Sequence, residues 1–233
     1  MRVFSDIHRV DNVSCNVYII TEPDGLTIID AGMPGAARRI LGAVAALRRS
    51  PRDVRHILLT HQHVDHIGSL AALVQATGAT TWASVGDTPA IEGRARREAP
   101  HGALGPIFRT VFFTRLRPCA IAQIVREGET LPVLSAEGGM RVIETPGHTL
   151  GHISFYLPAR RLLVAGDAVR ARMGRLALSP AMLNLDTTLA LQSVRKLAAL
   201  DIDACLPGHG APVTSGAQAL LAAIGAAPAL SKA

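Results

Sequence analysis

Residues 56–66 read HILLTHQHVDH, and this stretch determines how the rest of the sequence is interpreted. Its first half is mostly apolar, which is typical of a buried strand. The second half places His61, His63, Asp65 and His66 within six residues, and imidazoles and carboxylates bind zinc, iron or manganese. Alternate side chains of an extended segment share a face, so the first two histidines can point to one centre. A turn toward a following helix can bring the last two side chains to an adjacent centre.

Three more polar motifs follow predicted strands farther along the chain. Residues 145–149 read TPGHT, residues 165–167 read AGD and residues 207–210 read PGHG. Strand ends at one edge of a sheet can hold polar groups on a rigid scaffold, so we expect these motifs to converge. The candidate metal ligands are His61, His63, Asp65, His66, His148, Asp167 and His209.

The hydrophobic pattern predicts strands and helices in both halves of the chain. Helical spacing predicts helices over residues 35–49, 69–75 and 186–200. Gly78 is expected to end the second helix, and Asp186 to cap the third at its start. Strands with interspersed helices predict an α/β fold in which two mixed sheets pack together under outer helices. The predicted strands cover residues 16–20, 26–30, 56–60, 140–144, 153–157, 162–165 and 204–206, the first two forming a hairpin.

The order of these motifs resembles that of the metallo-β-lactamase superfamily. The pattern is His-x-His-x-Asp-His, then Gly-His-Thr, Gly-Asp and Gly-His-Gly, and it covers nearly the whole chain. The resemblance implies a four-layer αβ/βα sandwich, and some of the motifs are shared with glyoxalase II-like enzymes. It also implies that residues 30–32, which read DAG, support the ligand loop, with Asp30 orienting ligands through hydrogen bonds.

The same resemblance implies two divalent metal ions, with zinc expected and iron or manganese as alternatives. The catalytic residue is expected to be Asp65, which would direct a metal-bound hydroxide toward the substrate by a hydrogen bond. His152 lies where the superfamily commonly has a second histidine that is not a ligand, so we expect it to support the ligands. The implied ligands are His61, His63 and His148 for the first ion, Asp65, His66 and His209 for the second, and Asp167 as the bridge.

Composition predicts one globular domain over residues 1–233, because 48% of the residues are hydrophobic and 18% are charged. The apolar stretches are far shorter than the roughly 20 residues that cross a bilayer. The start of the chain has no apolar signal segment, so we expect a cytoplasmic location and no membrane partner. The three cysteines are widely separated, which predicts buried free thiols. The sequence contains no signal for the oligomeric state.

The net charge of +6 could favour anionic ligands, but it comes almost entirely from scattered arginines. Arg94, Arg96 and Arg97 form the densest cluster, and no aromatic residues alternate with them as in single-strand binders. We therefore expect a small-molecule substrate and no nucleic-acid partner. An acidic substrate group could contact Arg170, Arg172 or the cluster. The alternative is that these residues are ordinary solvent-exposed arginines with no role in substrate binding.

The least regular part of the chain covers residues 85–120, where glycines and prolines repeatedly interrupt the pattern. We expect substrate-covering loops there. His8, His56 and His101 are interpreted as surface or structural histidines.

Together these features predict a dinuclear metal-dependent hydrolase that acts on an ester, thioester, lactone or related small molecule. Lactonases of the superfamily commonly have a tyrosine shortly after the bridging aspartate, where this chain has Ala168, Val169 and Arg170, and this difference argues against a lactonase. Three alternatives stay open. They are an iron-dependent oxidoreductase resembling the persulfide dioxygenases of this fold, a phosphodiesterase or nuclease, and a non-catalytic binding protein.

Overall fold

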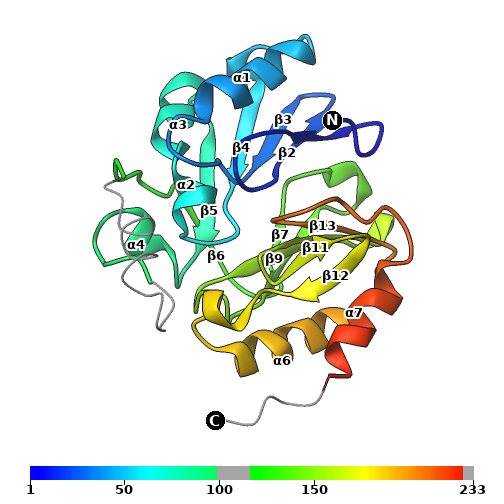
Figure 1. Cartoon of the computed structure of the whole chain (residues 1–233). Coiled ribbons are helices and arrows are strands. Elements are labelled where there is room, and N and C mark those ends of the chain that lie inside the picture. Colours follow the sequence, from blue (N-terminus) through cyan, green and yellow to red (C-terminus); the bar gives the residue numbers. More distant parts are fainter. Residues whose placement is uncertain (99–115, 228–233) are drawn as a thin grey trace. The chain divides into compact units, whose positions relative to one another are not determined.

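The computed structural model describes residues 1–98 and 116–227 (Figure 1). The chain divides into two compact units, which are described separately. Among the described residues, unit 1 comprises 1–98 and 116–125, and unit 2 comprises 126–227. Every helix in these ranges is too short or too polar to span a bilayer.

Unit 1 contains a mixed six-stranded sheet with the strand order β1-β2-β3-β4-β5-β6. The first three strands run antiparallel, and β3 to β6 run parallel. Parallel neighbours need crossover connections, which here contain helices α1 to α4. The strands are β1 Ile7–Val10, β2 Val17–Glu22, β3 Gly25–Ile29, β4 Val54–Leu58, β5 Thr80–Ser84 and β6 Gln123–Val125. The helices are α1 Ala37–Ala46, α2 Val64–Ile67, α3 Leu70–Thr77 and α4 Thr88–Ile91, with a 3-10 turn at Pro51–Asp53.

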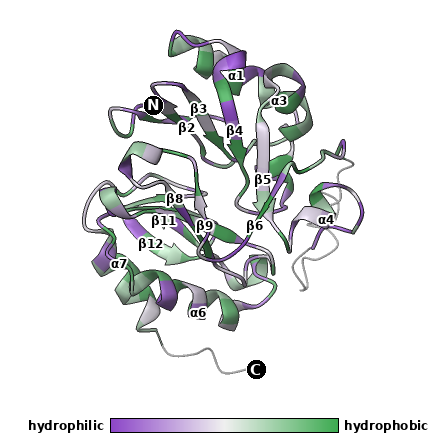
Figure 2. Cartoon of the chain, turned by 180° about the vertical axis from the view of Figure 1, so that it is seen from behind, coloured by the Kyte–Doolittle hydropathy of each residue, from purple (hydrophilic) through white to green (hydrophobic). Residues whose placement is uncertain are grey.

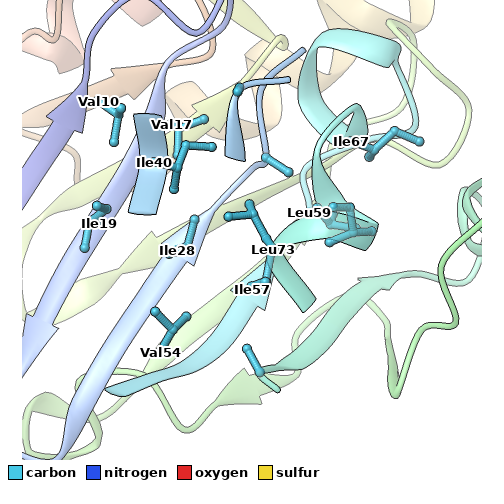
Figure 3. Close-up of a cluster of buried hydrophobic side chains, with 14 of the residues drawn as sticks. Val10, Val17, Ile19, Ile28, Ile40, Val54, Ile57, Leu59, Ile67 and Leu73 are labelled. Atoms are coloured by element: carbon cyan, nitrogen blue, oxygen red, sulfur yellow. The ribbon is translucent and has the colours of Figure 1, made fainter. Parts of the chain in front are cut away.

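The core of unit 1 lies between its sheet and two helices. Ile19, Ile28 and Ile57 lie on successive strands and belong to one buried cluster with Ile40 of α1 and Leu73 of α3 (Figure 3). Because side chains alternate between the faces of a strand, these residues define one face of the sheet. Figure 2 shows both hydrophilic and hydrophobic colour on α1, as expected for an amphipathic helix.

Unit 2 contains a five-stranded sheet with the order β13-β10-β9-β8-β7, together with the hairpin β11-β12. Strands β10 and β13 are parallel, and the other neighbours in the sheet are antiparallel. The strands are β7 Thr130–Leu131, β8 Met140–Glu144, β9 Ile153–Leu157, β10 Leu162–Gly166, β11 Val169–Arg172, β12 Arg175–Leu178 and β13 Ala204–Pro207. The helices are α6 Thr187–Ala198 and α7 Ala217–Gly225, with 3-10 turns at Ser135–Glu137, Pro158–Arg160 and Ala181–Leu183.

The two helices of unit 2 pack beside each other (Figure 1). Val194 and Leu197 of α6 and Leu221 of α7 belong to one buried cluster with Leu163 of β10 and Cys205 of β13. The apolar stripe predicted for α6 is therefore the face that packs into this core.

Most of the predicted elements are present, with shifted ends. The strands predicted at 140–144 and 153–157 are β8 and β9. The strand predicted at 56–60 instead ends at Leu58, because Thr60 leaves the ladder to bind Asp30. Helix α3 ends at Gly78, which has the expected left-handed φ of 72°.

Several short elements were not predicted. Strands β1, β6, β7, β11 and β12 have two to four residues, too few for a clear alternation of polar and apolar residues, and the five-residue strand β5 was also missed. Helix α7 was missed because its sequence AQALLAAIG has almost no polar face to reveal a helical period.

Candidate metal centre

The predicted ligands of unit 1 lie together on the connection between β4 and α2. His61 and His63 follow the strand, and His63 keeps an extended backbone with φ −67° and ψ 150°. Asp65 and His66 lie in α2. The ring centroid of His61 lies 4.7 Å from that of His63 and 4.0 Å from that of His66. The Asp65 Oδ2 atom lies 3.8 Å from His66 Nε2, so all four side chains gather at one end of β4.

Asp30 supports this loop through a buried hydrogen-bond network. Its carboxylate accepts hydrogen bonds from the Thr60 amide (2.9 Å) and from the Thr60 hydroxyl (2.9 Å to Oδ2). His66 Nδ1 lies 2.8 Å from Asp30 Oδ2 and must donate its proton, because a carboxylate only accepts. Since the Thr60 hydroxyl donates to Asp30, it accepts from His61 Nδ1 at 3.0 Å. Both rings therefore hold their lone pair at Nε2.

The strained backbone of Asp30 agrees with a functional position. Its φ of 63° lies in the left-handed region, which few residues other than glycine adopt. The surrounding hydrogen bonds hold this conformation in place, and residues held in this way concentrate at functional sites. Asp30 binds Thr60 and His66 directly, and its role in orienting ligands stays a prediction.

A second buried carboxylate holds the loop from another side. Asp87 precedes α4 and is 1% exposed. Its Oδ2 accepts from the Gln62 amide at 2.8 Å, and its Oδ1 accepts from Gln62 Nε2 at 3.0 Å. Gln62 lies between two predicted ligands, so this contact fixes the path of the backbone that carries them.

The three predicted ligands of unit 2 also lie together. The Nε2 atoms of His148 and His209 lie 3.5 Å and 3.3 Å from Oδ2 of Asp167. Gly208 makes this approach possible, because a Cβ atom there would lie 2.0 Å from Asp167 Oδ1. The glycine of the PGHG motif is therefore required by the position of the aspartate.

His152 binds protein atoms through both ring nitrogens. The Asp167 amide donates to its Nε2 at 3.0 Å. Its Nδ1 lies 2.8 Å from the Thr145 hydroxyl, which lies 3.0 Å from the Ser154 hydroxyl. Ser154 donates to the Ala165 carbonyl, so its oxygen accepts from the Thr145 hydroxyl. The Thr145 oxygen in turn accepts from His152 Nδ1. The ring supports the backbone of Asp167, and its assignment as a residue that is not a ligand stays a prediction.

The donor set in each unit fits a divalent ion. It consists of imidazole nitrogens and carboxylate oxygens, the ligands that zinc, iron and manganese accept. Two atoms bound to one tetrahedral ion at about 2.0–2.2 Å lie roughly 3.3–3.6 Å apart, and the distances from Asp167 to His148 and His209 match this spacing. A carboxylate oxygen between two imidazoles suits the bridging role predicted for Asp167. Which ion each residue binds stays a prediction.

The cysteines contribute no thiolate to these sites. Burial raises the pKa of the Cys15 thiol to about 11 although His66 lies nearby, and burial raises that of Cys205 to about 12. Cys119 is partly buried, and its pKa is also raised by burial. All three are free thiols, and Cys15 and Cys205 are also buried as predicted, whereas Cys119 is only partly buried.

The other candidates are scattered. Arg94 pairs with Glu92, while Arg96 is exposed and Arg97 is partly buried. Arg170 and Arg172 lie on β11. His8 and His56 lie on strands β1 and β4, as expected of structural histidines. His101 and much of the loop region predicted at 85–120 lie outside the described residues.

Sequence reasoning missed several residues that hold the predicted ligands. Thr60 directly precedes the histidine motif, so its position was a usable signal. Asp87, Ser179 and Asn184 carry no local signal, because they reach the predicted ligands or their loop only through the fold.

Comparisons with known proteins agree with this geometry. The profile of the metallo-beta-lactamase superfamily matches residues 10–209. The chain is 30% identical over 227 residues to a probable metallo-hydrolase, YflN, from Bacillus subtilis (strain 168), covering 89% of this chain and 85% of that protein. It is 33% identical over 169 residues to a hydroxyacylglutathione hydrolase from Cereibacter sphaeroides, covering 71% of this chain but only 52% of that protein.

The solved structures give the same answer for the fold. A metallo-beta-lactamase family protein from Thermus thermophilus matches with a TM-score of 0.75 at 21% identity, covering 97% of this chain and 80% of that chain. This likeness and the mixed sheets with their helices confirm the predicted metallo-β-lactamase fold. The chain belongs to the metallo-beta-lactamase superfamily and is a metal-dependent hydrolase of that superfamily.

Proposed function

We propose that this protein is a dinuclear metal-dependent hydrolase of small-molecule esters, thioesters or lactones. The observation that carries the proposal is the Asp167 carboxylate, whose Oδ2 faces two imidazole Nε2 atoms at ligand-to-ligand distances. We propose that the ligands of unit 1 and those of unit 2 bind the same two ions, with zinc as the expected metal. The match of the superfamily profile to residues 10–209, which contain all seven predicted ligands, supports this assignment.

The chemistry follows from the donor set. Bound divalent ions lower the pKa of water toward neutrality and polarise the oxygen of the scissile group. The imidazoles of His61, His66 and His148 hold their lone pairs at Nε2 because Thr60, Asp30 and Asn184 accept the protons at Nδ1. These contacts reduce the reorganisation needed when a metal binds.

Asp65 is the residue proposed to act on the attacking water. Its side chain is 22% exposed, whereas that of His66 is fully buried, so the carboxylate remains accessible from solvent. As a hydrogen-bond acceptor it would orient the water toward the substrate, and solvent would protonate the leaving group.

The substrate class rests on the relatives. Hydroxyacylglutathione hydrolases are named for an acylated glutathione, but this chain spans about half of their length. We therefore propose only the class of esters, thioesters and lactones, and no single compound. A cytoplasmic location and one domain over residues 1–233 stay predictions.

A substrate panel tests the proposal. Purified protein with measured metal content is assayed with esters, thioesters, lactones, phosphodiesters and β-lactams. We expect hydrolysis of at least one of the first three classes, and loss of that activity in His61→Ala and Asp167→Ala with the fold retained, because each change removes a ligand rather than core volume. Asp24→Asn, an exposed carboxylate in the β2–β3 turn, serves as the control.

Two results would contradict the proposal. One is equal activity of the wild type and the ligand variants under metal-controlled conditions. The other is protein purified with iron that consumes oxygen in the presence of a sulfur substrate, which would identify an oxidoreductase instead.

A further inference from the structure

Asn184 is a buried polar residue that lies beside a predicted ligand in unit 2. It lies between β12 and α6 and is 5% exposed. Its Oδ1 lies 3.2 Å from His148 Nδ1, and its Nδ2 donates to the Ser179 carbonyl at 3.0 Å. An amide nitrogen donates and an amide oxygen accepts, so the contact with Ser179 determines that the oxygen faces the histidine.

This orientation determines where His148 carries its proton. Because Asn184 Oδ1 only accepts, Nδ1 of the imidazole must donate, and in the neutral imidazole the lone pair then lies on Nε2. Nε2 is the atom that lies 3.5 Å from Asp167 Oδ2. The hydrogen bond thus selects both the tautomer and the direction of the ring.

The segment that carries Asn184 is itself tied to the backbone of the site. The Leu185 amide donates to the His148 carbonyl at 3.3 Å, and the Asp186 amide donates to the Gly147 carbonyl at 2.9 Å. The Ser179 hydroxyl donates to the Asp167 carbonyl at 2.7 Å. Both ends of the segment therefore contact predicted ligand motifs, and Asn184 is held at a fixed place between these contacts.

We propose that Asn184 is a positioning residue for His148. It holds the ring with Nδ1 protonated and Nε2 directed at Asp167, so that the imidazole can bind a divalent ion without a change of tautomer. The inference rests on the proposed metal-dependent function. Loss of the hydrogen-bond partner of a metal-binding histidine typically lowers metal affinity or activity about 10–100-fold.

Three variants separate positioning from general loosening of the structure. Asn184→Leu removes both hydrogen bonds at similar side-chain volume. Asn184→Asp keeps an oxygen that accepts from His148 but loses the donor to the Ser179 carbonyl. The control is Ser193→Ala, because the buried Ser193 hydroxyl donates to the Pro146 carbonyl on the same turn at 2.7 Å but does not bind the His148 ring.

Two measurements test the proposal. Nitrogen-15 NMR of the metal-free protein reports the tautomer of His148, whose signals are identified by their loss in His148→Gln. Competition with a chromophoric chelator gives the zinc affinity. We expect protonated Nδ1 in the wild type, Asn184→Asp and Ser193→Ala, and loss of this tautomer in Asn184→Leu. Zinc affinity should fall about 10–100-fold in Asn184→Leu and change by less than about threefold in the other two variants.

Several results would overturn the proposal. One is a wild-type His148 protonated at Nε2, and another is unchanged zinc affinity in Asn184→Leu. An equal loss of affinity in Ser193→Ala would assign the effect to the turn rather than to the ring. If Asn184→Leu does not fold, the test rests on the tautomer of His148 in the wild type and in Asn184→Asp. A proton on Nδ1 in both proteins supports the proposal, and its absence from either contradicts it. If His148→Gln binds zinc as tightly as the wild type, His148 is not a ligand and the proposed metal site is wrong. The comparison of tautomers would still test the hydrogen bond from His148 to Asn184.

Discussion

At the scale of single residues, three of the predicted histidine ligands share one arrangement. His61, His66 and His148 each use Nδ1 for a hydrogen bond to a protein oxygen. His152 differs, because the Asp167 amide also binds its Nε2. The structure therefore gives a physical reason why His148 is available as a ligand, whereas His152 supports the backbone of Asp167.

Asp65 gives the first prediction at this scale. Asp65→Asn should lower kcat by about 10²–10⁴-fold and leave the Michaelis constant nearly unchanged, because the amide is a weaker acceptor for the attacking water. Steady-state kinetics on protein with measured metal content checks this. A change confined to the Michaelis constant would assign Asp65 to substrate binding. If Asp65→Asn loses metal in proportion to its loss of activity, the residue acts only as a metal ligand.

Asp87 gives a prediction about stability. Asp87→Asn places an amide nitrogen against one of the two Gln62 donors, and a buried unsatisfied donor costs about 1–3 kcal/mol. Urea unfolding should show a decrease of this size in the free energy of unfolding. The exposed Asp24→Asn is the matched control and should be unchanged within about 0.5 kcal/mol. Equal stability of both variants would show that the Asp87 carboxylate is not required.

At the scale of elements, the parallel strands β4 and β5 are joined by a side-chain contact beside the backbone ladder. Trp82 Nε1 donates to His56 Nδ1 at 3.2 Å, and the two rings meet edge to face. Trp82 is the only tryptophan of the chain. Its fluorescence therefore reports on this pair of strands.

The burial of His56 predicts a dependence of stability on pH. Burial lowers the pKa of His56 below its usual 6.5, although Glu22 and Asp24 act in the opposite direction. The unfolded chain then binds the proton more readily, so stability is fully present above about pH 6.5 and falls as the pH decreases toward the folded-state pKa. Urea unfolding followed by Trp82 fluorescence should show this fall in the wild type, and a smaller fall in His56→Gln, which does not titrate. Identical pH profiles would rule out His56 as the source.

Helix α6 shows how an element places site residues. Asp186 caps it by accepting from the Leu189 amide at 2.9 Å, as predicted. The backbone amide of Asp186 donates to the Gly147 carbonyl. The start of the helix is therefore joined to the turn that carries His148.

At the scale of the whole molecule, the proposed function requires both units to supply ligands to the same ions. A ligand that binds only the folded state raises the melting temperature. We expect zinc to raise the melting temperature of chelator-treated wild type, and His63→Ala and His209→Ala, one in each unit, to abolish most of this increase. Asp24→Asn should respond like the wild type. Persistence of the full increase in either ligand variant would show that its unit does not contribute.

The sequence by itself determined the family, the order of the main elements and the candidate ligands. These properties reside in short contiguous patterns, such as an apolar strand followed by a histidine motif, which local chemistry makes recognisable. Only the tertiary structure decided which groups hold the ligands in place. Asn184 and His148 lie 36 residues apart, and Asp87 and Gln62 lie 25 apart. The direction of a hydrogen bond between such residues depends on how the chain folds, and no local pattern records it.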